Sequence, residues 1–212
     1  MRNKAVIVST AAAVLALGAA ACGSSTSPSA ASSKPAAASP AASSPAGSAG
    51  TTSADFGPGC ASVPASGAGS FSGMAPAPVA TAASANPLLS TLVSAVKKAG
   101  LVGTLNSAKS ITVFAPDNAA FAAIPAGTLD KILADKGELT AILTYHVAAG
   151  RVTPAELASG KPIKTLEGGT ITPAKMGGTY EVNNAKVVCG NVQTANATVY
   201  IISSVLTPPA NG

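Results

Sequence analysis

Apolar positions that follow Asn86-Pro87 recur with the period of an α-helix. They form one stripe that consists of Leu88, Leu89, Leu92, Val93 and Val96. A proline at the first helical position favours a helix start, whereas the basic pair Lys97-Lys98 and the following Gly100 favour a helix end. The pattern therefore predicts an amphipathic helix that begins near residue 87 and ends just before Gly100.

Three shorter helices are predicted further along the chain. The first begins near Thr128 and carries the apolar residues Leu129, Ile132 and Leu133, and the second covers residues 138–143. Thr153-Pro154-Ala155-Glu156 has the residues of a capping box with proline at the first helical position, so a third helix should run to about Ser159. Helices thus dominate the first half of this region.

The period changes to that of strands after residue 160. Short apolar or alternating runs cover residues 163–166, 170–174, 179–182, 186–188, 192–194 and 198–203. Pairs such as Gly177-Gly178 and Asn183-Asn184 separate them, which is typical of tight turns. Residues 111–114 and 145–147 are expected to join the same sheet. Helices first and strands later predict an α+β fold, and residues 55–212 suffice for one domain.

The N-terminus has the pattern of an export signal. Arg2 and Lys4 precede an apolar or small-residue run from Ala5 to Ala21, which is the charged and hydrophobic order of a signal peptide. The run is shorter than the ~20 apolar residues of a membrane helix and lacks a basic flank after it. We therefore expect residues 1–21 to be a lipoprotein signal peptide that is removed on export.

Cys22 is the expected lipid attachment site. Residues 17–22, LGAAAC, resemble a bacterial lipobox, although Ala19 replaces the usual leucine, and an ordinary secretory signal is the alternative. Two acyl chains on this thiol would hold the protein stably, because one chain gives only marginal binding. The expected location is the outer face of the cell membrane or the cell wall, with partial shedding left open.

Residues 23–54 are expected to be a disordered tether. They are almost wholly Ser, Ala, Pro, Gly and Thr, with Lys34 as the single charge, so they cannot bury enough apolar surface to fold. A flexible chain of this length spans roughly 30 Å. Glycosylation of the Ser and Thr residues is left open.

Cys60 and Cys189 remain once Cys22 is assigned to the anchor. Two cysteines in an exported protein form at most one intramolecular disulfide, and two unpaired buried thiols are the alternative. The bridge would join the N-terminal lead to the sheet.

Three blocks of sequence together carry a family resemblance. They are ITVFAPDNAAF at residues 111–121, Tyr145-His146, and VYIISSVLTPP at residues 199–209. In this order, over roughly a hundred residues, they resemble the signature of the fasciclin domain, and most of all the single-domain fasciclin proteins that actinobacteria secrete or anchor by lipid. The resemblance covers about residues 55–210. It implies a bent β-sheet wedge with several helices packed against it, and an extracellular adhesion module.

The resemblance implies mainly structural roles for the motif residues. These are Thr112, Phe114, Ala115, Pro116, Asp117, Phe121, Tyr145, His146, Val199, Leu206 and Pro208. Asp117 is expected to cap the short helix that follows it. His146, the only histidine, is expected to be a buried imidazole that hydrogen-bonds backbone and locks the corner between a helix and a strand.

Three positions depart from the family pattern. Tyr200 and Ser203 stand where the family usually has histidine and aspartate, which puts the polar contacts of those places in doubt. Asn196-Ala197 replaces the usual Asn-Gly, and we expect Asn196 to tolerate the left-handed conformation of a hairpin turn. Although Asn196-Ala197-Thr198 also matches a glycosylation acceptor, we interpret it as structural.

Charge and composition exclude several classes of function. The net charge is +5, and removal of Arg2 and Lys4 leaves a balance of about +3 without a basic run, so nucleic-acid binding is not expected. A single histidine excludes histidine-rich zinc sites and provides poorly for a catalytic triad. Asp117 alone is poor evidence for calcium. We expect no catalytic residue, metal site or cofactor.

The leading hypothesis is a non-catalytic, lipid-anchored adhesion or interaction protein that is presented on a spacer. Its partner would be an unknown extracellular protein or cell-wall polymer, and we expect a monomer. The adhesion role is implied only by the resemblance. An envelope-structural protein that binds its own wall glycan or glycolipid is the first alternative, and an exported hydrolase is the second. No Arg-Gly-Asp occurs, so ligand-binding residues stay unassigned.

Replacement of Cys22 should abolish anchoring. Because the thiol is the expected site of the diacylglyceryl group, the Cys22→Ser protein should incorporate no labelled palmitate and should be shed or kept as precursor. Metabolic labelling followed by fractionation measures both effects. A Cys22→Ser protein that is still labelled and bound to the membrane would contradict the lipobox interpretation.

Overall fold

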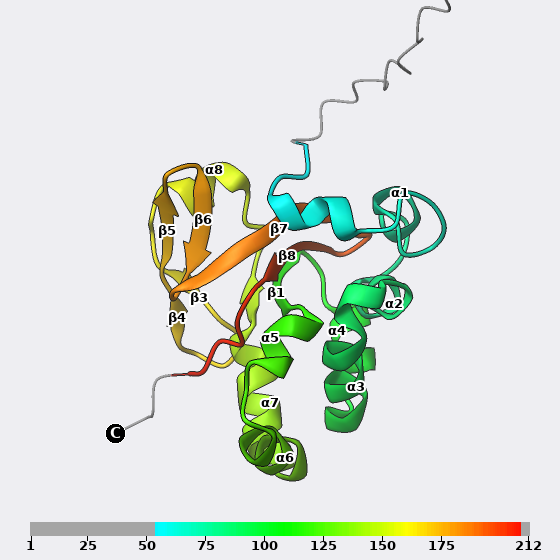
Figure 1. Ribbon diagram of the computed structural model, residues 1–212, viewed down its shortest axis with the longest axis vertical. Coiled ribbons are helices and arrows are strands. Elements are labelled where there is room, and N and C mark those ends of the chain that lie inside the picture. Colours follow the sequence, from blue (N-terminus) through cyan, green and yellow to red (C-terminus); the bar gives the residue numbers. More distant parts are fainter. Residues whose placement is uncertain (1–53, 209–212) are drawn as a thin grey trace, which may run out of the picture. The chain divides into compact units, whose positions relative to one another are not determined.

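The computed structural model of the protein describes residues 54–208, and the predicted signal peptide, Cys22 and nearly all of the tether lie outside them. The described residues combine helices with strands, which confirms the α+β class (Figure 1). The helices are η1 (Pro58–Ser62), α1 (Phe71–Met74), α2 (Val79–Ala85), η2 (Pro87–Leu89), α3 (Ser90–Ala99), α4 (Val102–Ser107), α5 (Asn118–Ala122), α6 (Ala126–Ala134), α7 (Lys136–Tyr145) and α8 (Pro154–Ala158). The strands are β1 (Ile111–Pro116), β2 (Val147–Ala149), β3 (Ile163–Lys164), β4 (Thr170–Ile171), β5 (Pro173–Met176), β6 (Thr179–Val182), β7 (Ala185–Gln193) and β8 (Ala197–Ile202).

Strands β1 and β8 form the middle of a six-stranded sheet whose order is β2-β1-β8-β7-β6-β5. They run parallel, with Ile111 opposite Ala197 and Pro116 opposite Ile202, whereas the neighbouring pairs in this sheet are antiparallel. All six residues of each central strand are buried. Unbroken burial is typical of a strand that is covered on both faces.

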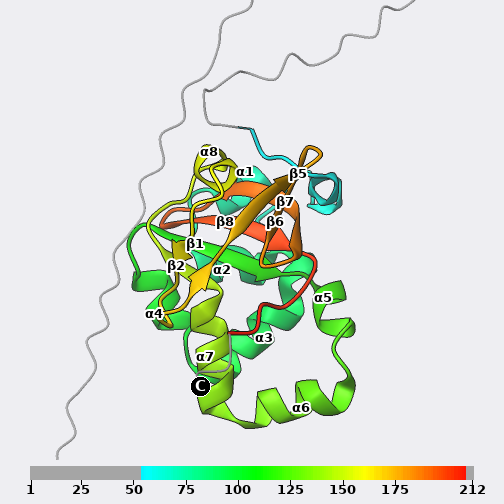
Figure 2. The same cartoon turned by 90° about the vertical axis from the view of Figure 1, so that its left-hand side faces the viewer.

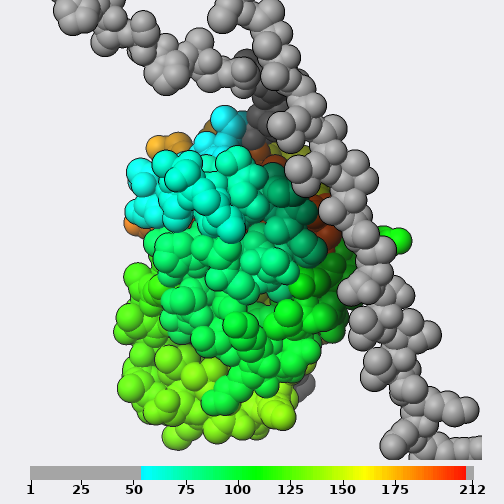
Figure 3. All heavy atoms as spheres, turned by 90° about the vertical axis from the view of Figure 1, so that its right-hand side faces the viewer, coloured from blue at the N-terminus to red at the C-terminus, as the bar shows by residue number. Residues whose placement is uncertain are grey.

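The two faces of the central strands belong to different hydrophobic cores, because successive side chains of a strand point to opposite faces. Val113 and Ile201 pack in the core that the helices cover, whereas Phe114 and Tyr200 pack in a second core beneath α8 and β6. Figure 2 shows β1 and β8 between α3, α6 and α7 on one side and α8 with β5 and β6 on the other. Figure 3 views the helical side, where α1 to α4 appear in cyan and green.

The predicted helix after Pro87 is confirmed, although its first turn is the 3₁₀ segment η2. The Asn86 side chain accepts the Leu88 N–H at 3.0 Å and thereby starts the segment. Gly100 ends α3 in the left-handed conformation, with φ 74°, as a glycine at this place favours. The capping box at α8 is also present, since Thr153 Oγ1 accepts the Glu156 N–H and Glu156 Oε2 accepts the Thr153 N–H.

A disulfide and a short backbone bridge hold the N-terminal lead against β7. Cys60 and Cys189 are bonded, with their Cα atoms 4.8 Å apart and a sequence separation of 129. Beside them, Phe56 and Gly190 exchange backbone hydrogen bonds of 3.2 and 2.7 Å. A side chain at position 190 would place its Cβ within 2.4 Å of the Phe56 ring. Glycine therefore lets the lead approach the strand closely.

Two strand predictions are wrong in their division of the chain. Residues 170–174 do not form one strand, because β4 and β5 pair in different sheets. The break falls at Thr172, whose N–H donates to Asn183 Oδ1 and whose carbonyl accepts the Asn183 N–H. Conversely, residues 186–188 and 192–194 lie in the single strand β7, apart from Thr194. Its register shifts between Val187 and Val192, as a β-bulge allows.

Helices α1, α2 and α4 are absent from the sequence prediction. Helix α2 has the sequence VATAASA, and its small side chains give almost no apolar period. Tertiary contacts stabilise it instead, since Val79, Ala80 and Ala82 are buried.

Within residues 54–208 no single helix has the length and apolar character of a membrane span. Helix α2 and the segment Pro87–Ala99 meet both conditions only when they are taken together, and they are bent by 104° relative to each other.

Loss of either Cys60 or Cys189 should destabilise the domain equally. Chain entropy sets an upper figure of about 4 to 5 kcal/mol for a closed loop of this length, so the melting temperature should fall by up to roughly 20 °C. Thermal unfolding of Cys60→Ala, Cys189→Ala and the double variant measures the losses. The double variant should lose little more than either single one, and additive losses would contradict a shared bridge.

Candidate functional site

His146 fixes the corner between α7 and β2. Its side chain is 2% exposed. The imidazole Nδ1 lies 2.8 Å from the carbonyl oxygen of Ile142, and Nε2 accepts the backbone N–H of Leu206 at 2.9 Å. Since Nε2 accepts a hydrogen bond, the ring is neutral with its proton on Nδ1. The single histidine thus ties the corner to the C-terminal segment.

Burial lowers the pKa of His146 to about 4, while the hydrogen bond to the Ile142 carbonyl opposes that shift. A proton on Nε2 would also face the Leu206 N–H, so the positive form loses this hydrogen bond. The group is therefore uncharged at neutral pH, and it makes its contacts to backbone atoms of the same chain. Tyr145 ends α7 and only Val147 of the predicted residues 145–147 enters β2, so the strand begins two residues later than predicted and extends to Ala149.

Three hydroxyls in the family blocks make structural hydrogen bonds. Tyr145 donates to the Thr170 carbonyl at 2.8 Å and accepts from the Asn183 amide at 2.7 Å. Thr112 donates to the Gly150 carbonyl and accepts the Val152 N–H. Tyr200 donates to the Val152 carbonyl at 2.8 Å, and burial raises the pKa of this phenol.

The Pro-Asp-Asn turn caps α5 and joins it to α3. Asp117 Oδ1 accepts the Ala120 N–H at 2.7 Å. Asn118 Oδ1 accepts the Thr91 N–H, and its amide donates to the Pro87 carbonyl. The turn therefore attaches the end of β1 to the start of the α3 segment, a role for Asn118 that local sequence does not indicate.

The remaining motif residues lie in the two cores or close to them. Phe114 is fully buried against Tyr200, with ring centroids 5.8 Å apart. The other buried motif residues are Ala115, Phe121, Val199 and Leu206, and Pro116 ends β1 opposite Ile202. Pro208 is partly exposed after the end of β8. Ser203, which replaces the family's usual aspartate, accepts the Lys186 N–H, so both divergent places make polar contacts.

Asn196 does not adopt the left-handed conformation that the turn pattern predicts, since it is not among the non-glycine residues with positive φ. Its side chain instead connects three segments that are distant in sequence. Oδ1 accepts the Val79 N–H at 2.8 Å, and Nδ2 donates to the carbonyls of Leu105 and Ala108, each at 2.8 Å. These bonds give the asparagine its structural role.

Arg151 is a further structural residue that the sequence analysis does not single out. Its guanidinium donates to the Gln193 side chain and to the carbonyls of Thr194, Ala195 and Ala197, at 2.9 to 3.1 Å. These acceptors lie in and next to the β7-β8 turn. The cation is therefore occupied by neutral oxygens of its own chain.

The motif residues thus form no reactive constellation. Within residues 54–208, no group of three His, Cys, Asp or Glu side chains could hold a metal ion. Asp117 caps a helix, and the neutral imidazole of His146 is bound at both nitrogens. The partners of both ring nitrogens are backbone atoms of Ile142 and Leu206, and neither is a nucleophile. The arrangement supports the fold rather than proton transfer.

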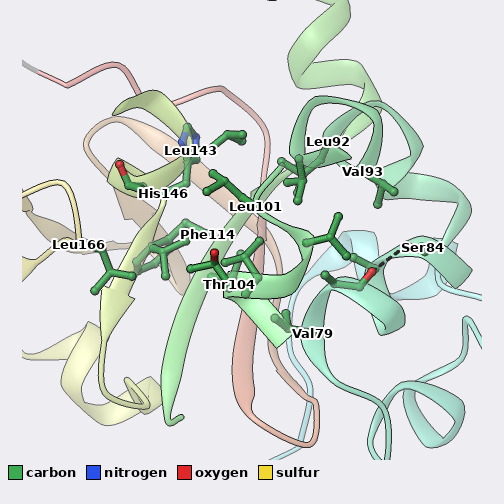
Figure 4. Close-up of a pocket in the computed structure, with 18 residues that line it drawn as sticks. Val79, Ser84, Leu92, Val93, Leu101, Thr104, Phe114, Leu143, His146 and Leu166 are labelled. Atoms are coloured by element: carbon green, nitrogen blue, oxygen red, sulfur yellow. Dashed lines mark hydrogen bonds between the residues drawn. The ribbon is translucent and has the colours of Figure 1, made fainter. Parts of the chain in front are cut away.

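A hollow on the helical side of the sheet is the candidate binding site. Figure 4 shows its walls, which come from α2, α3, α4, α7 and the strand β1, with Leu101 near the middle and Leu166 and Val93 at opposite ends of the view. Its space is about 720 Å³, part of which is open to solvent. Ligand sites commonly have mostly apolar walls.

The walls of this hollow are almost entirely aliphatic. Ser84 and Thr144 donate their hydroxyls to carbonyls of their own helices, Ala80 and Thr140, at 2.7 and 2.8 Å. His146 uses both ring nitrogens elsewhere. No buried side-chain nitrogen or oxygen in the described part of the chain lacks a hydrogen-bond partner. The hollow therefore offers shape and apolar contact rather than polar recognition.

The sequence analysis does not find this hollow because its residues are spread from Val79 to Leu166. The sequence offers one indication of the hollow, at Leu166. Leu166 is an apolar residue followed by Glu167-Gly168-Gly169, and in the structure it is 49% exposed although it lines the hollow. A large apolar side chain left exposed at a concave site is informative, whereas single exposed leucines elsewhere are not.

Comparison with known proteins places these features in a family. The fasciclin domain model matches residues 87–208. Immunogenic protein MPB70 of Mycobacterium bovis is 49% identical over 162 residues, which are 73% of this chain and 82% of that protein. Cell surface glycolipoprotein MPB83 of the same species is also 49% identical, over 73% of this chain and 72% of its own.

Two more distant similarities accompany these. Protein sll1483 of Synechocystis is 43% identical over 129 residues, which cover 60% of this chain and 71% of that protein. A solved FAS1 domain pair from the insect cell adhesion molecule Fasciclin I aligns with a TM-score of 0.48 and 21% identity, over 58% of this chain and 46% of that one.

The stability of the domain should fall between pH 6.5 and pH 4 because of His146. An unfolded histidine binds a proton near pH 6.5, whereas the folded one resists it until about pH 4. Its contribution is therefore complete above pH 6.5 and is lost as the pH falls, by about 3 kcal/mol in all. Urea unfolding of the wild type and of His146→Gln at pH 7, 5.5 and 4 measures this. The variant should be less stable at pH 7 and should lack this part of the pH dependence. An equal slope in both proteins would contradict the assignment.

Proposed function

Because the chain belongs to the fasciclin domain family, we propose that it is a non-catalytic cell-surface adhesion protein. In this proposal Cys22 carries a diacylglyceryl anchor, and the Ala/Ser/Pro-rich segment after it presents one fasciclin domain outside the membrane. The domain binds an extracellular protein or a cell-wall polymer. It acts as a monomer and needs no cofactor.

The observation that carries the proposal is the similarity to a protein named for its place on the cell. MPB83 is called a cell surface glycolipoprotein, and the aligned region covers 72% of its length. Near its N-terminus this chain carries Arg2, Lys4 and an apolar run that stops at Cys22. An export signal that ends at a lipid-modifiable cysteine supports the same location independently.

The state of the polar residues supports a non-catalytic role. A hydrolase of the triad type needs a histidine that can reach a nucleophile and exchange a proton near neutral pH. The sole histidine has a pKa of about 4 and spends both nitrogens on backbone atoms. The best-connected cation, Arg151, is likewise bound to its own chain. Function by surface contact is consistent with this arrangement.

The partner class is tested by presenting the protein on beads. The exported form of the Cys22→Ser chain is coupled to beads and incubated separately with isolated walls of the producing organism, with foreign cells and with matrix proteins. Retention of foreign cells or matrix proteins is expected for an adhesion protein. Retention of the organism's own walls alone would indicate the envelope-structural alternative instead.

The matched control is the same chain after reduction and alkylation, which opens the Cys60–Cys189 loop. Retention should depend on the folded domain, so this control should hold markedly less material. If neither walls, cells nor matrix proteins bind above the control, the adhesion proposal is wrong.

A further inference from the structure

We infer that the aliphatic hollow between α2, α3, α4 and β1 binds the hydrocarbon chain of an acyl lipid. The inference goes beyond the proposed surface role. It rests on that role only for the place at which the protein would encounter lipid. It is carried by the apolar walls of the site and by the hydrogen bonds that Ser84, Thr144 and His146 make elsewhere in the protein.

The walls select for hydrocarbon. Branched aliphatic side chains from five elements face the hollow, among them Val79, Leu92, Leu101 and Leu143 (Figure 4). Contact with such walls stabilises a ligand in proportion to the apolar area removed from water. Each methylene that enters should therefore raise the affinity up to about fourfold.

The walls also discriminate against polar occupants. Ser84, Thr144 and His146 direct their hydrogen-bonding atoms to partners within the protein. A peptide segment laid into the hollow would bury N–H and C=O groups without partners. Each such pair of groups would lower the affinity by roughly ten- to a thousandfold. A linear alkyl chain carries no such groups. A bound alkyl chain therefore leaves no polar group of its own unpaired, whereas a bound peptide does.

Part of the hollow is open to solvent, so it need not enclose the whole of a ligand. In Figure 4 the labelled lining residues include Leu166 and Val93 at opposite sides of the view, with Leu101 near the middle. Apolar cavities take up apolar ligands.

Leu166 marks one end of the site, where the polar head of a lipid could remain in water. It is 49% exposed, and Thr104 on α4 is also exposed among the lining residues. An exposed leucine here extends the apolar surface beyond the hollow. A carboxylate or ester head would thus stay solvated while the alkyl chain enters.

Such a chain could come from two sources. One is the acyl group on the protein's own Cys22, and the other is a lipid of the surrounding envelope or a free fatty acid. Both present the same hydrocarbon chemistry to the hollow. The test therefore compares a protein that has its anchor with one that lacks it.

Binding is measured by calorimetry with laurate and its shorter homologues octanoate and decanoate. The exported Cys22→Ser chain should bind laurate saturably, and the affinity should rise about two- to fourfold for each added methylene. The lipidated protein, purified in detergent and exchanged into buffer, is titrated in parallel. Reduced laurate capacity in it assigns the site to its own acyl group, whereas equal capacity assigns the site to external lipid.

Two variants locate the binding. Ala83→Leu adds atoms inside the hollow at a partly buried position of α2 and should weaken laurate binding at least tenfold. Leu166→Ser removes apolar contact at one end and should weaken it about threefold or more. Met176→Ser is the matched control, because Met176 is, within residues 54–208, the other large exposed apolar residue, at 60%, and does not line the hollow. It should bind as the parent does.

The melting temperature of each variant is measured first, so that a loss of folding is separated from a loss of binding. If the folded Cys22→Ser chain binds no laurate, or if Ala83→Leu and Met176→Ser bind equally well, the inference is overturned. Failure of the bead experiment alone removes the adhesion proposal and leaves acyl binding intact. Failure of laurate binding alone does the reverse.

Discussion

The parallel pairing of β1 with β8 is the constraint on which the rest of the structure depends. It joins residues that lie more than eighty positions apart, and it places six consecutive buried residues of each strand in the middle of the sheet. Because such strands expose apolar side chains on both faces, each face must be covered. The helices cover one face, and α8 with the β5–β7 strands covers the other. Two hydrophobic cores follow from one strand pair.

Buried polar side chains then fix how the covering segments attach. His146 joins the end of α7 to Leu206, and Asn196 joins the β7-β8 turn to α2 and to the residues around α4. A buried polar group that loses its partner costs about 1 to 3 kcal/mol, so these contacts specify one arrangement among several that would bury similar apolar area. The same contacts occupy the residue types that catalysis would need.

The proposed function depends on the surface of the domain and on the location of the protein. The chain shares about half of its aligned residues with mycobacterial surface antigens of the fasciclin family, at 49% identity. The concave feature that its helical side offers is mostly aliphatic, and its buried polar groups hydrogen-bond within the protein. A site of this chemistry would suit hydrocarbon, which is abundant at the membrane where the proposed lipid anchor would hold the protein. Acyl binding and surface presentation are therefore compatible within one small domain.

The sequence by itself determined the local features. The apolar runs at β1 and β8, the Pro-Asp-Asn cap, the capping box at α8 and the helix that ends at Gly100 are each encoded within a few residues, so propensity and period suffice to find them. Tertiary structure decided what depends on distant partners. Thr172 divides a strand because Asn183 binds it, Asn196 becomes a bridge because α2 and α4 lie beside its turn, and small-residue α2 is stable because it is buried. The aliphatic hollow belongs to this second class, since its walls meet only after β1 has paired with β8 and the helices have packed against the sheet.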